Sequence, residues 1–488
     1  MTTVDGEVPV SYASRLATLA QRDGIAVRVA HLDGSEESVP WSVLDERSTQ
    51  VARALAARGL AAGDRLAVGV RNSSQLVLAV LGAWKVGATP VPFRWDLPAW
   101  EQGRVLDVIA APFHLTDDDV PWIDATVDQP AEPLPEAIAE FTHGICSSGS
   151  TGTPKVILIG RPGTWDSTIG RPFPEAWQPV PTPQTVLVPA PMYHTNGFST
   201  FYNLVAGDTL VIMERFDAAK VVDLVERHGI STITATPTML QRIADLPGVD
   251  ERDWSSIQWM LQGAAGIAPS LVHRWIELVG ADRFFMSYGM TEGLGLACIR
   301  ADEWVEHQGS VGRGYRETEI RIKGPDGELL PAGEVGEIWL RSPSTGMYKY
   351  LGGGTGQLVS DDDGFSTGGD MGRLDDDGFL YIADRRVDMI ISGGANVFPA
   401  EVENALVDHP GIADVVVIGL PDPEWGHRVH AIVEPADPAA PPAADDVIAY
   451  AKSRLAAYKV PKTVELVPSI PRSEATKVNR GALVAERS

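Results

Sequence analysis

The stretch Cys146-Ser147-Ser148-Gly149-Ser150-Thr151-Gly152-Thr153-Pro154-Lys155 decides how the rest of this chain is interpreted. It places five hydroxyl side chains, two glycines and one lysine within ten residues. Glycines let backbone N–H groups turn towards an anion, hydroxyls add donors, and a lysine supplies a mobile positive charge. The composition predicts a loop that wraps a polyphosphate, and the alternative is a flexible Ser/Gly surface turn.

This loop is not a Walker A loop, because Pro154 stands five residues after Gly149 and Val156 follows the lysine where Ser or Thr is required. It resembles the phosphate-binding signature of the adenylate-forming enzymes, the superfamily of acyl-CoA synthetases, luciferases and peptide-synthetase adenylation domains. The resemblance extends from about Arg47 to Lys477. It implies that the loop binds the phosphates of ATP through Ser147, Ser148, Gly149, Ser150, Thr151, Gly152 and Lys155.

Size and charge limit the classes of protein that fit. A chain of 488 residues exceeds what one core usually supports, so at least two domains are expected. Forty Lys and Arg against 65 Asp and Glu give a net charge of −25, which disfavours binding to nucleic acid or anionic membrane. Two cysteines exclude a disulfide framework, and no Cys/His cluster has zinc spacing. Without a membrane-length apolar run or a signal-peptide pattern, we expect a cytoplasmic protein.

Amphipathic helices alternate with short apolar strands along the first 300 residues. One helix is expected behind Ser48 and a strand at 66–70, and Asn72-Ser73-Ser74 can cap the next helix. The alternation recurs as helix and strand at 219–228 and 230–235, then at 271–279 and 284–286. Such βαβ units predict an α/β fold with a doubly wound parallel sheet. The Pro-rich run 171–183 is expected to be a surface excursion.

The pattern changes twice in the second half of the chain. Between 310 and 340, Gly-Pro-Asp-Gly turns separate alternating segments such as 319–322, which predicts a small antiparallel β subdomain. After Asp384, mixed helices and strands predict a mobile α+β C-terminal domain. We therefore expect an N-terminal domain at 1–384, a hinge at 385–388 and a C-terminal domain at 389–488. Val387 is non-polar where the family's hinge residue is usually polar.

The second strong signal is Ser287-Tyr288-Gly289-Met290-Thr291-Glu292, directly after the predicted strand 284–286. Open α/β sheets bind ligands outside the carboxyl ends of their strands, so this position suits a site. The resemblance places Tyr288 against adenine, Thr291 on phosphate and Glu292 on Mg²⁺. One glutamate suffices for magnesium because the nucleotide and water complete the octahedron. The structural alternative is a Thr-Glu pair that caps a helix.

Thr367-Gly368-Gly369-Asp370 resembles the family's Thr-Gly-Asp, whose aspartate accepts hydrogen bonds from both ribose hydroxyls. One additional glycine leaves the register open, but Asp370 is the expected acceptor. The resemblance assigns Arg385, in Asp384-Arg385-Arg386-Val387-Asp388, to ribose or phosphate.

Three further segments are assigned by resemblance. His194 is expected to border the acyl carboxylate, and Gln262-Gly263-Ala264-Ala265 to line the acyl and adenine sites, where small residues leave space for a flat ring. The alternatives are an ordinary hydrogen-bonded histidine and strand-end turn chemistry. Gly393, Gly394 and Trp425 are expected beside a pantetheine tunnel, although a Gly-Gly pair is equally a structural turn.

Pro471-Arg472-Ser473-Glu474-Ala475-Thr476-Lys477 resembles the segment that supplies the catalytic lysine, with Thr476 where glycine is common. The implied enzyme joins a carboxylic acid to ATP, releases pyrophosphate, and passes the acyl group to coenzyme A. Its cofactors are ATP, Mg²⁺ and CoA. The alternatives are an amide synthetase, an enzyme that loads a carrier protein, and a binding protein without chemistry. An apolar or aromatic acid is expected from a pocket of Phe198, Phe201, Tyr202, Met239 and Met286.

Overall fold

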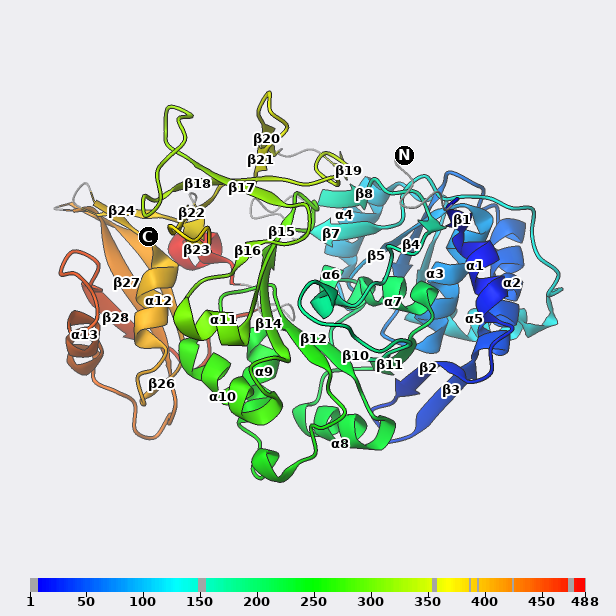
Figure 1. Cartoon of the computed structure of the whole chain (residues 1–488), viewed down its shortest axis with the longest axis horizontal. Coiled ribbons are helices and arrows are strands. Elements are labelled where there is room, and N and C mark those ends of the chain that lie inside the picture. Colours follow the sequence, from blue (N-terminus) through cyan, green and yellow to red (C-terminus); the bar gives the residue numbers. More distant parts are fainter. Residues whose placement is uncertain are drawn as a thin grey trace.

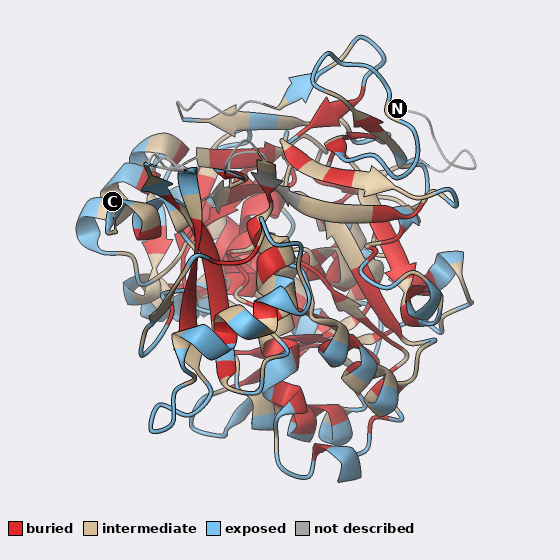
Figure 2. Cartoon of the chain, turned by 90° about the vertical axis from the view of Figure 1, so that its left-hand side faces the viewer, coloured by how far each residue is buried: buried red, intermediate tan, exposed pale blue. Residues whose placement is uncertain are grey.

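The structure of the protein is a computed structural model that describes residues 8–147, 155–352, 358–385, 388–392, 395–423, 425–472 and 478–487. A large α/β body forms most of the molecule, and strands β26 and β27 belong to a smaller C-terminal domain at one end of it (Figure 1). Buried residues concentrate on the interior strands, and exposed residues on the outward faces of the helices (Figure 2).

The main sheet of the body has the strand order β16-β15-β14-β13-β12-β10-β11-β2-β3. Its central run from β14 to β2 is parallel, and β15, β16 and β3 add antiparallel edges. The parallel strands are β2 (Ile25–Ala30), β10 (Thr185–Val188), β11 (Thr209–Met213), β12 (Thr232–Ala235), β13 (Trp259–Gln262) and β14 (Phe284–Gly289). The edges are β3 (Glu36–Pro40), β15 (Leu296–Arg300) and β16 (Arg313–Gly314).

Helices connect the parallel strands and cover the sheet. The crossovers on the β11-to-β14 side are α8 (Ala218–His228), α9 (Pro237–Ala244) and α10 (Pro269–Val279). A second parallel sheet, β5-β4-β6, contains β4 (Arg65–Gly69), β5 (Thr89–Pro92) and β6 (His114–Thr116). These two parallel sheets confirm the predicted α/β class.

Helix α3 (Ser74–Val86) shows how the sequence defines one element of this body. Ser73 caps it by accepting a hydrogen bond from the backbone N–H of Leu76 at 3.1 Å, and Gly87 ends it at φ +85°. The helix is buried along nearly its whole length against α2 (Trp41–Ala57). At Gly82 an added Cβ would lie 3.0 Å from Cγ1 of Val51, so glycine permits the close approach.

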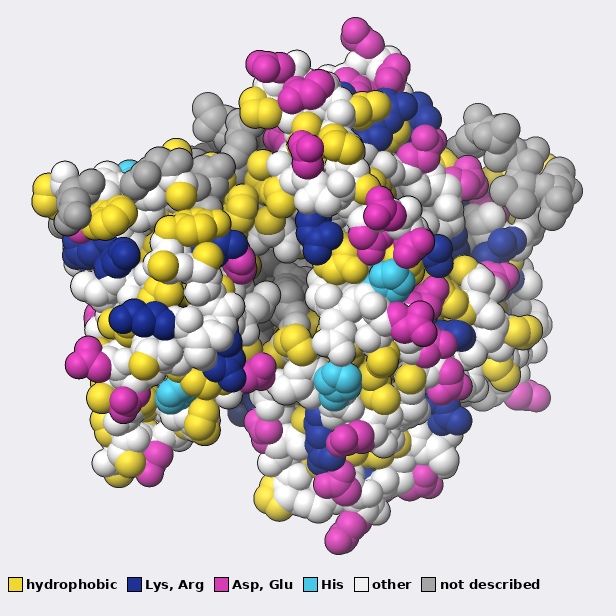
Figure 3. All heavy atoms as spheres, turned by 60° about the vertical axis from the view of Figure 1, so that its left-hand side comes forward, with side chains coloured by type: hydrophobic (Ala, Val, Ile, Leu, Met, Phe, Trp, Pro, Cys, Tyr) yellow, Lys and Arg dark blue, Asp and Glu magenta, His cyan; other side chains and the backbone are white. Residues whose placement is uncertain are grey.

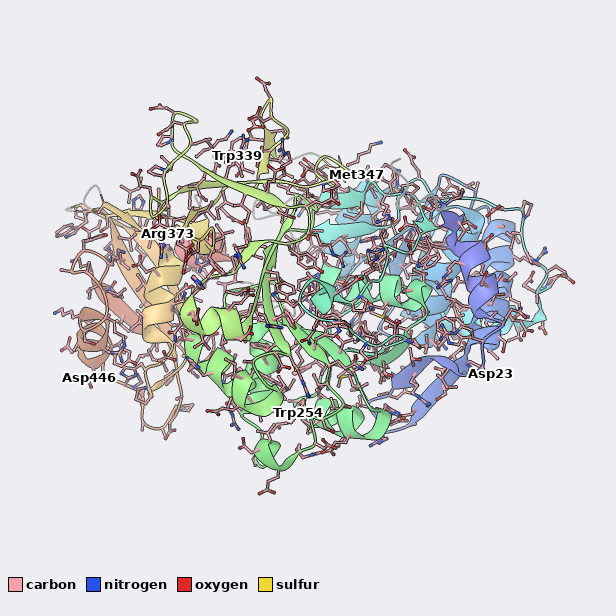
Figure 4. All side chains as sticks on the ribbon, in the orientation of Figure 1. Asp23, Trp254, Trp339, Met347, Arg373 and Asp446 are labelled. Carbon is pink, nitrogen blue, oxygen red and sulfur yellow. The ribbon has the colours of Figure 1, made fainter. Side chains whose placement is uncertain are left out.

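A third, antiparallel sheet with the order β19-β8-β7 connects the body to the β subdomain. Strands β7 (Gly144–Ser147) and β8 (Lys155–Ile159) form a hairpin in which Ser147 pairs with Lys155. Strand β19 (Tyr348–Leu351) pairs with β8. The backbone N–H of Gly160 donates to the carbonyl of Met347 at 2.7 Å. Met347 lies just before β19 (Figure 4). The segment that leads from the β subdomain is therefore tied to the β7–β8 hairpin.

The β subdomain is built from antiparallel strands, which confirms the prediction. Its strands follow the order β20-β21-β18-β22-β23, and β17 pairs with β18. They are β17 (Glu319–Lys323), β18 (Gly336–Arg341), β20 (Val359–Ser360), β21 (Ser366–Thr367), β22 (Asp370–Leu374) and β23 (Leu380–Arg385).

The C-terminal domain has a core of its own. A sheet with the order β25-β24-β27-β26, extended by β28, packs against helices α12 (Pro399–Leu406) and α13 (Ala444–Lys452). Its strands are β24 (Ile390–Ser392), β25 (Ala395–Val397), β26 (Ile412–Asp422), β27 (Gly426–Pro435) and β28 (Thr463–Leu466). Val402, Val417 and Val447 belong to one buried cluster within this domain.

The run 171–183 lies largely at the surface, as predicted, and its aromatic residues Phe173 and Trp177 are half-buried. Phe173 stacks on Tyr315 with ring centroids 4.5 Å apart, and Trp177 meets Phe285 at 5.2 Å. Both rings pack on a small cluster that contains the buried side chain of Trp259. Proline-rich composition predicted the surface position but not these aromatic contacts, because they depend on partners more than 80 residues away.

His143 is a buried histidine that directly precedes β7. Its ring stacks on Phe198 with centroids 4.2 Å apart, and its Nδ1 lies 3.5 Å from the hydroxyl of Tyr202. Burial lowers the pKa of His143 from 6.5 to about 3. The folded protein therefore holds this imidazole neutral over a range in which the unfolded chain protonates it.

We expect the protein to lose stability between pH 6.5 and pH 3, because the unfolded state binds a proton that folded His143 does not. At pH 5 this contribution is about 2 kcal/mol, from 1.36 kcal/mol per pKa unit. His143→Gln should remove that part of the acid sensitivity. The measurement is the urea unfolding midpoint of both proteins at pH 7 and pH 5. An equal drop in both proteins would show that other groups cause the acid sensitivity.

Candidate active site

A cavity of about 1670 Å³ lies at the carboxyl ends of parallel strands β12, β13 and β14. Residues after β10 and residues of the β subdomain complete its walls, and Ala400 and Asn404 of helix α12 border it from the C-terminal domain. The surface is hollowed between the C-terminal domain and the body (Figure 3). The position agrees with the general rule that open α/β sheets bind ligands at this edge.

Tyr288 and Asp370 meet in this cavity from two different sheets. Tyr288 lies near the end of β14, and its hydroxyl donates to Oδ2 of Asp370 at 2.7 Å. Asp370 begins β22 and is 9% exposed. The additional glycine of the Thr-Gly-Gly-Asp segment, Gly369, adopts φ +82° and donates its N–H to Oγ1 of Thr367. That turn places Asp370 in the cavity wall.

Thr291 and Glu292 lie in a turn after β14, not at the start of a helix, so the helix-cap alternative is wrong. Oγ1 of Thr291 lies 3.1 Å from Oγ1 of Thr195. The hydroxyl of Tyr350 donates to Oε1 of Glu292 at 2.7 Å. Both side chains are thus held by groups distant in sequence while they border the cavity.

His194 is the N-cap residue of the short helix α6 (Thr195–Phe198) and lines the cavity. Its ring centroid lies 4.4 Å from that of Tyr193, which also lines the cavity. The neighbouring Thr195 contacts Thr291, so the 191–196 segment and the Thr-Glu turn face one another. This geometry puts His194 near the residues expected at the phosphate and metal.

Gly263, Ala264 and Ala265 follow β13 and form a wall of small residues. The side-chain amide of Gln262 donates to the carbonyl of Ala265 at 2.6 Å and so closes the turn. Ala264 adopts φ +76°, a left-handed conformation that costs a non-glycine residue about 1–2 kcal/mol. The strained position lies at the cavity, where such strain commonly occurs.

Several predicted site residues lie outside the described part of the chain. These are Ser148, Gly149, Ser150, Thr151 and Gly152 of the phosphate loop, Gly393 and Gly394, and Lys477. The backbones of Ser147 and Arg385 are described as the last residues of β7 and β23, and Arg385 pairs with Asp370 across β22 and β23.

Trp425 is placed on a turn of the C-terminal domain and is 37% exposed. The ammonium of Lys462 lies 4.8 Å from its ring centroid. Trp425 is not part of the cavity wall described above.

The predicted acyl pocket is partly wrong. Met239 and Met286 line the cavity. Phe198 and Phe201 are instead buried in the core, where both rings pack edge-on against Trp84, and Tyr202 packs against the same core. Apolar character alone could not separate cavity wall from core, because both require the same side chains.

Sequence reasoning missed Tyr350 and Thr195. Tyr350 belongs to the alternating run Tyr348-Lys349-Tyr350-Leu351, which signals a strand but not a contact with a glutamate 58 residues earlier. Thr195 directly follows His194 in the sequence, and nothing in its residue type points to a contact with Thr291. Only the packing of β19 and α6 around the Thr291–Glu292 turn brings them to the site.

Cys146, another cavity residue, is held as a thiol, since burial raises its pKa to about 12. Among the described residues, no group of three or more His, Cys, Asp or Glu side chains could hold a metal ion by itself. Within the same ranges, no helix has the length and apolar character needed to cross a membrane.

Comparison with known proteins identifies the family. The model of the AMP-binding enzymes matches residues 19–351, and that of the AMP-binding enzyme C-terminal domain matches residues 401–477. Feruloyl-CoA synthase of an Amycolatopsis species is 32% identical over 465 residues, which cover 91% of this chain and 93% of the relative. The long-chain-fatty-acid–CoA ligase FadD13 of Mycobacterium tuberculosis is 30% identical over 507 residues, with 95% and 97% coverage.

The o-succinylbenzoate CoA synthetase MenE from Bacillus subtilis, solved with its acyl-adenylate intermediate OSB-AMP, superimposes with a TM-score of 0.84. It is 28% identical, and the match covers 98% of both chains. MenE has also been solved with ATP and a magnesium ion, and that structure matches with a TM-score of 0.83 at 27% identity. The chain belongs to the AMP-binding enzymes, the adenylate-forming superfamily that its phosphate loop resembles.

Proposed function

We infer that the chain is an AMP-forming carboxylic acid–CoA ligase, which activates an acid with ATP, releases pyrophosphate and transfers the acyl group to coenzyme A. The observation that carries this inference is the convergence of the Tyr288–Asp370 pair and the Thr291–Glu292 turn on one cavity. The relatives support it, because one is named a feruloyl-CoA synthase and FadD13 a fatty-acid–CoA ligase, and both align with more than nine tenths of this chain.

The walls of the cavity supply a place for each part of ATP. We propose that adenine lies between Tyr288 and the small residues Gly263, Ala264 and Ala265. The ribose hydroxyls donate to the buried carboxylate of Asp370, and Arg385 contacts ribose or phosphate. The phosphates extend towards Thr291 and the loop that begins at Ser147 and ends at Lys155. The family resemblance of that loop and its attachment to the β7–β8 hairpin support this placement.

Glu292 fits a magnesium ion bound with ATP. It presents a carboxylate to the cavity, and Mg²⁺ prefers one or two carboxylates together with phosphate oxygens and water. A metal bound there would neutralise developing charge on the phosphoryl oxygens. The protein would hold the carboxylate of the substrate acid in line with the phosphates of ATP. The anionic acid could then approach the α-phosphate.

The second half-reaction needs access for a thiol. Helix α12 of the C-terminal domain already borders the cavity, and the hydroxyl of Ser270 in α10 donates to Asp408 of that domain at 2.7 Å. We propose residues 385–388 as the hinge between an N-terminal domain at 1–384 and a C-terminal domain at 389–488. Rotation about that hinge would move Lys477 out of the active site and bring in Gly393, Gly394 and the pantetheine arm of CoA.

We propose that the acid is apolar or aromatic. Met239, Met286 and Tyr193 line the cavity, as does His194, and Ile145 and Ile157 contribute from the β7–β8 hairpin. These side chains offer dispersion contacts and few polar partners, which suits a ring or a medium chain. The net charge of −25 supports small-molecule partners over nucleic acid.

The proposed function is tested by pyrophosphate release over a panel of aromatic, alicyclic, fatty and steroid acids, with and without CoA. We expect ATP-dependent pyrophosphate release with at least one apolar acid and thioester formation when CoA is present. Adenylation followed by transfer to an amine, with CoA ignored, would replace this proposal by an amide synthetase. No adenylation of any acid would overturn it.

A further inference from the structure

Glu292, the carboxylate assigned to the metal, is held by a residue from another part of the fold. We propose that Tyr350 is a positioning residue whose hydroxyl holds Oε1 of Glu292, so that Oε2 serves the magnesium ion of the nucleotide complex. This inference rests on the proposed function, because it assigns a role to a residue that supports the same site.

The contact joins two segments that are 58 residues apart in the sequence. Tyr350 is half-buried on β19, Glu292 lies in the turn after β14, and their oxygens are 2.7 Å apart. A hydrogen bond to an ionised carboxylate is about twice as strong as one between neutral groups. The phenol is the donor in this bond, because an ionised carboxylate can only accept hydrogen bonds. The hydrogen bond therefore restricts rotation of the Glu292 carboxylate about its Cγ–Cδ bond.

The same region anchors the turn at two backbone positions. The hydroxyl of Ser344 donates to the carbonyl of Gly293 at 2.8 Å, and that of Thr345 donates to the carbonyl of Leu294 at 2.7 Å. Residues 344–350 thus hold both the backbone after Glu292 and its side chain. Fixing a ligand this way lowers the entropy that must be lost when the metal binds.

Tyr350 also contacts the lysine of the phosphate loop. It pairs directly with Ile157 across β19 and β8, and Lys155 is two residues from Ile157, so all three side chains share one face of the sheet. The ammonium of Lys155 lies 5.7 Å from the Tyr350 ring centroid, within the range of a cation–π contact. Tyr350 therefore contacts the ammonium of Lys155 through the face of its ring and the carboxylate of Glu292 through its hydroxyl.

Glu292 belongs to the cavity wall, whereas Tyr350 is not among the described residues that form it. Tyr350 therefore acts through Glu292 and not on the substrates. Removing its hydroxyl should weaken metal binding more than it slows the chemical step at saturating metal.

The experiment titrates Mn²⁺ into the full-length protein in the presence of α,β-methylene ATP, with bound metal followed by electron paramagnetic resonance. Tyr350→Phe keeps the ring beside Lys155 and removes only the hydroxyl. We expect the Kd of Mn²⁺ to rise about tenfold, which corresponds to about 1.4 kcal/mol. In pyrophosphate release, the apparent KM for Mg²⁺ should rise by a similar factor while kcat at saturating Mg²⁺ stays within about threefold.

Tyr381→Phe is the matched control, since the hydroxyl of Tyr381 donates to Oδ2 of Asp375 at 3.1 Å and neither residue is part of the described cavity wall. It should bind Mn²⁺ like the wild type. Equal Mn²⁺ affinity in Tyr350→Phe and wild type, a kcat loss without a change in the Mg²⁺ KM, or the same loss in Tyr381→Phe would each overturn the positioning role. No acid is needed for the titration, so failure to find an acid substrate leaves the result standing. A wild type that binds no Mn²⁺ with the nucleotide would overturn both proposals.

Discussion

Lys477→Ala is expected to lower ATP-dependent thioester formation about a hundred- to a thousandfold and to leave the conversion of supplied acyl-adenylate plus CoA largely intact. The lysine, which lies outside the described residues, is proposed to act while the carboxylate attacks phosphorus and negative charge accumulates there. Removing a preorganised charge from a transition state typically costs about 3–4 kcal/mol. In the second half-reaction the thiol attacks a carbonyl whose leaving group is AMP, so the lysine is no longer needed.

The measurement is single-turnover product formation from synthetic acyl-adenylate, compared with the full reaction from ATP and acid. Lys462→Ala is a matched control, because this lysine also belongs to the C-terminal domain but its ammonium lies over the exposed ring of Trp425. It should adenylate at the wild-type rate. Equal losses of Lys477→Ala in both half-reactions would refute a role confined to the first.

Asp370→Ala should raise the apparent KM for ATP about 30- to 150-fold, because a charged acceptor for two ribose hydroxyls contributes on the order of 2–3 kcal/mol. The carboxylate begins β22 at the cavity wall and is only 9% exposed, so water cannot readily replace it as the partner. The KM for the acid should change little. Both constants follow from initial rates of pyrophosphate release with one substrate varied at a time.

Asp370 also accepts a hydrogen bond from the hydroxyl of Tyr288. Asp370→Ala would therefore lose both the proposed ribose contact and this hydrogen bond. Tyr288→Phe separates them, since it keeps the ring expected against adenine and loses only the hydrogen bond to Oδ2. This variant should raise the KM for ATP much less than Asp370→Ala does. If the two variants have the same KM, the aspartate acts by placing Tyr288, and the ribose contact belongs to another residue.

The contact between Thr195 and Thr291 bears on how the acid and the phosphates are brought together. His194, next to Thr195, lines the cavity, while Thr291 precedes the proposed metal ligand. The His194 segment and the proposed phosphate turn therefore meet at a pair of hydroxyls 3.1 Å apart. An acid carboxylate seated near His194 would lie beside the phosphates and not at the far end of the cavity.

The sequence by itself determined the class of fold and the positions of several helices and strands. The signals that define single elements act locally and can be recognised from neighbouring residues. They are helix caps such as Ser73, turn glycines such as Gly87, and the alternation of apolar strands with amphipathic helices. The order of motifs also predicted the family, which the comparisons confirmed, and pointed to Tyr288, Asp370 and Glu292, which the fold brings to one cavity.

The tertiary structure alone decided which side chains meet. Phe198 and Phe201 pack into the core whereas Met239 and Met286 reach the cavity, although hydropathy treats all four alike. The Thr-Gly-Gly-Asp register was open until Gly369 was seen in a left-handed turn that leads Asp370 to the wall. The hydrogen bond from Tyr350 to Glu292 spans 58 residues and depends on how β19 pairs with β8. Such contacts arise from the pairing of distant strands, and a single sequence carries no local signal for which strands pair.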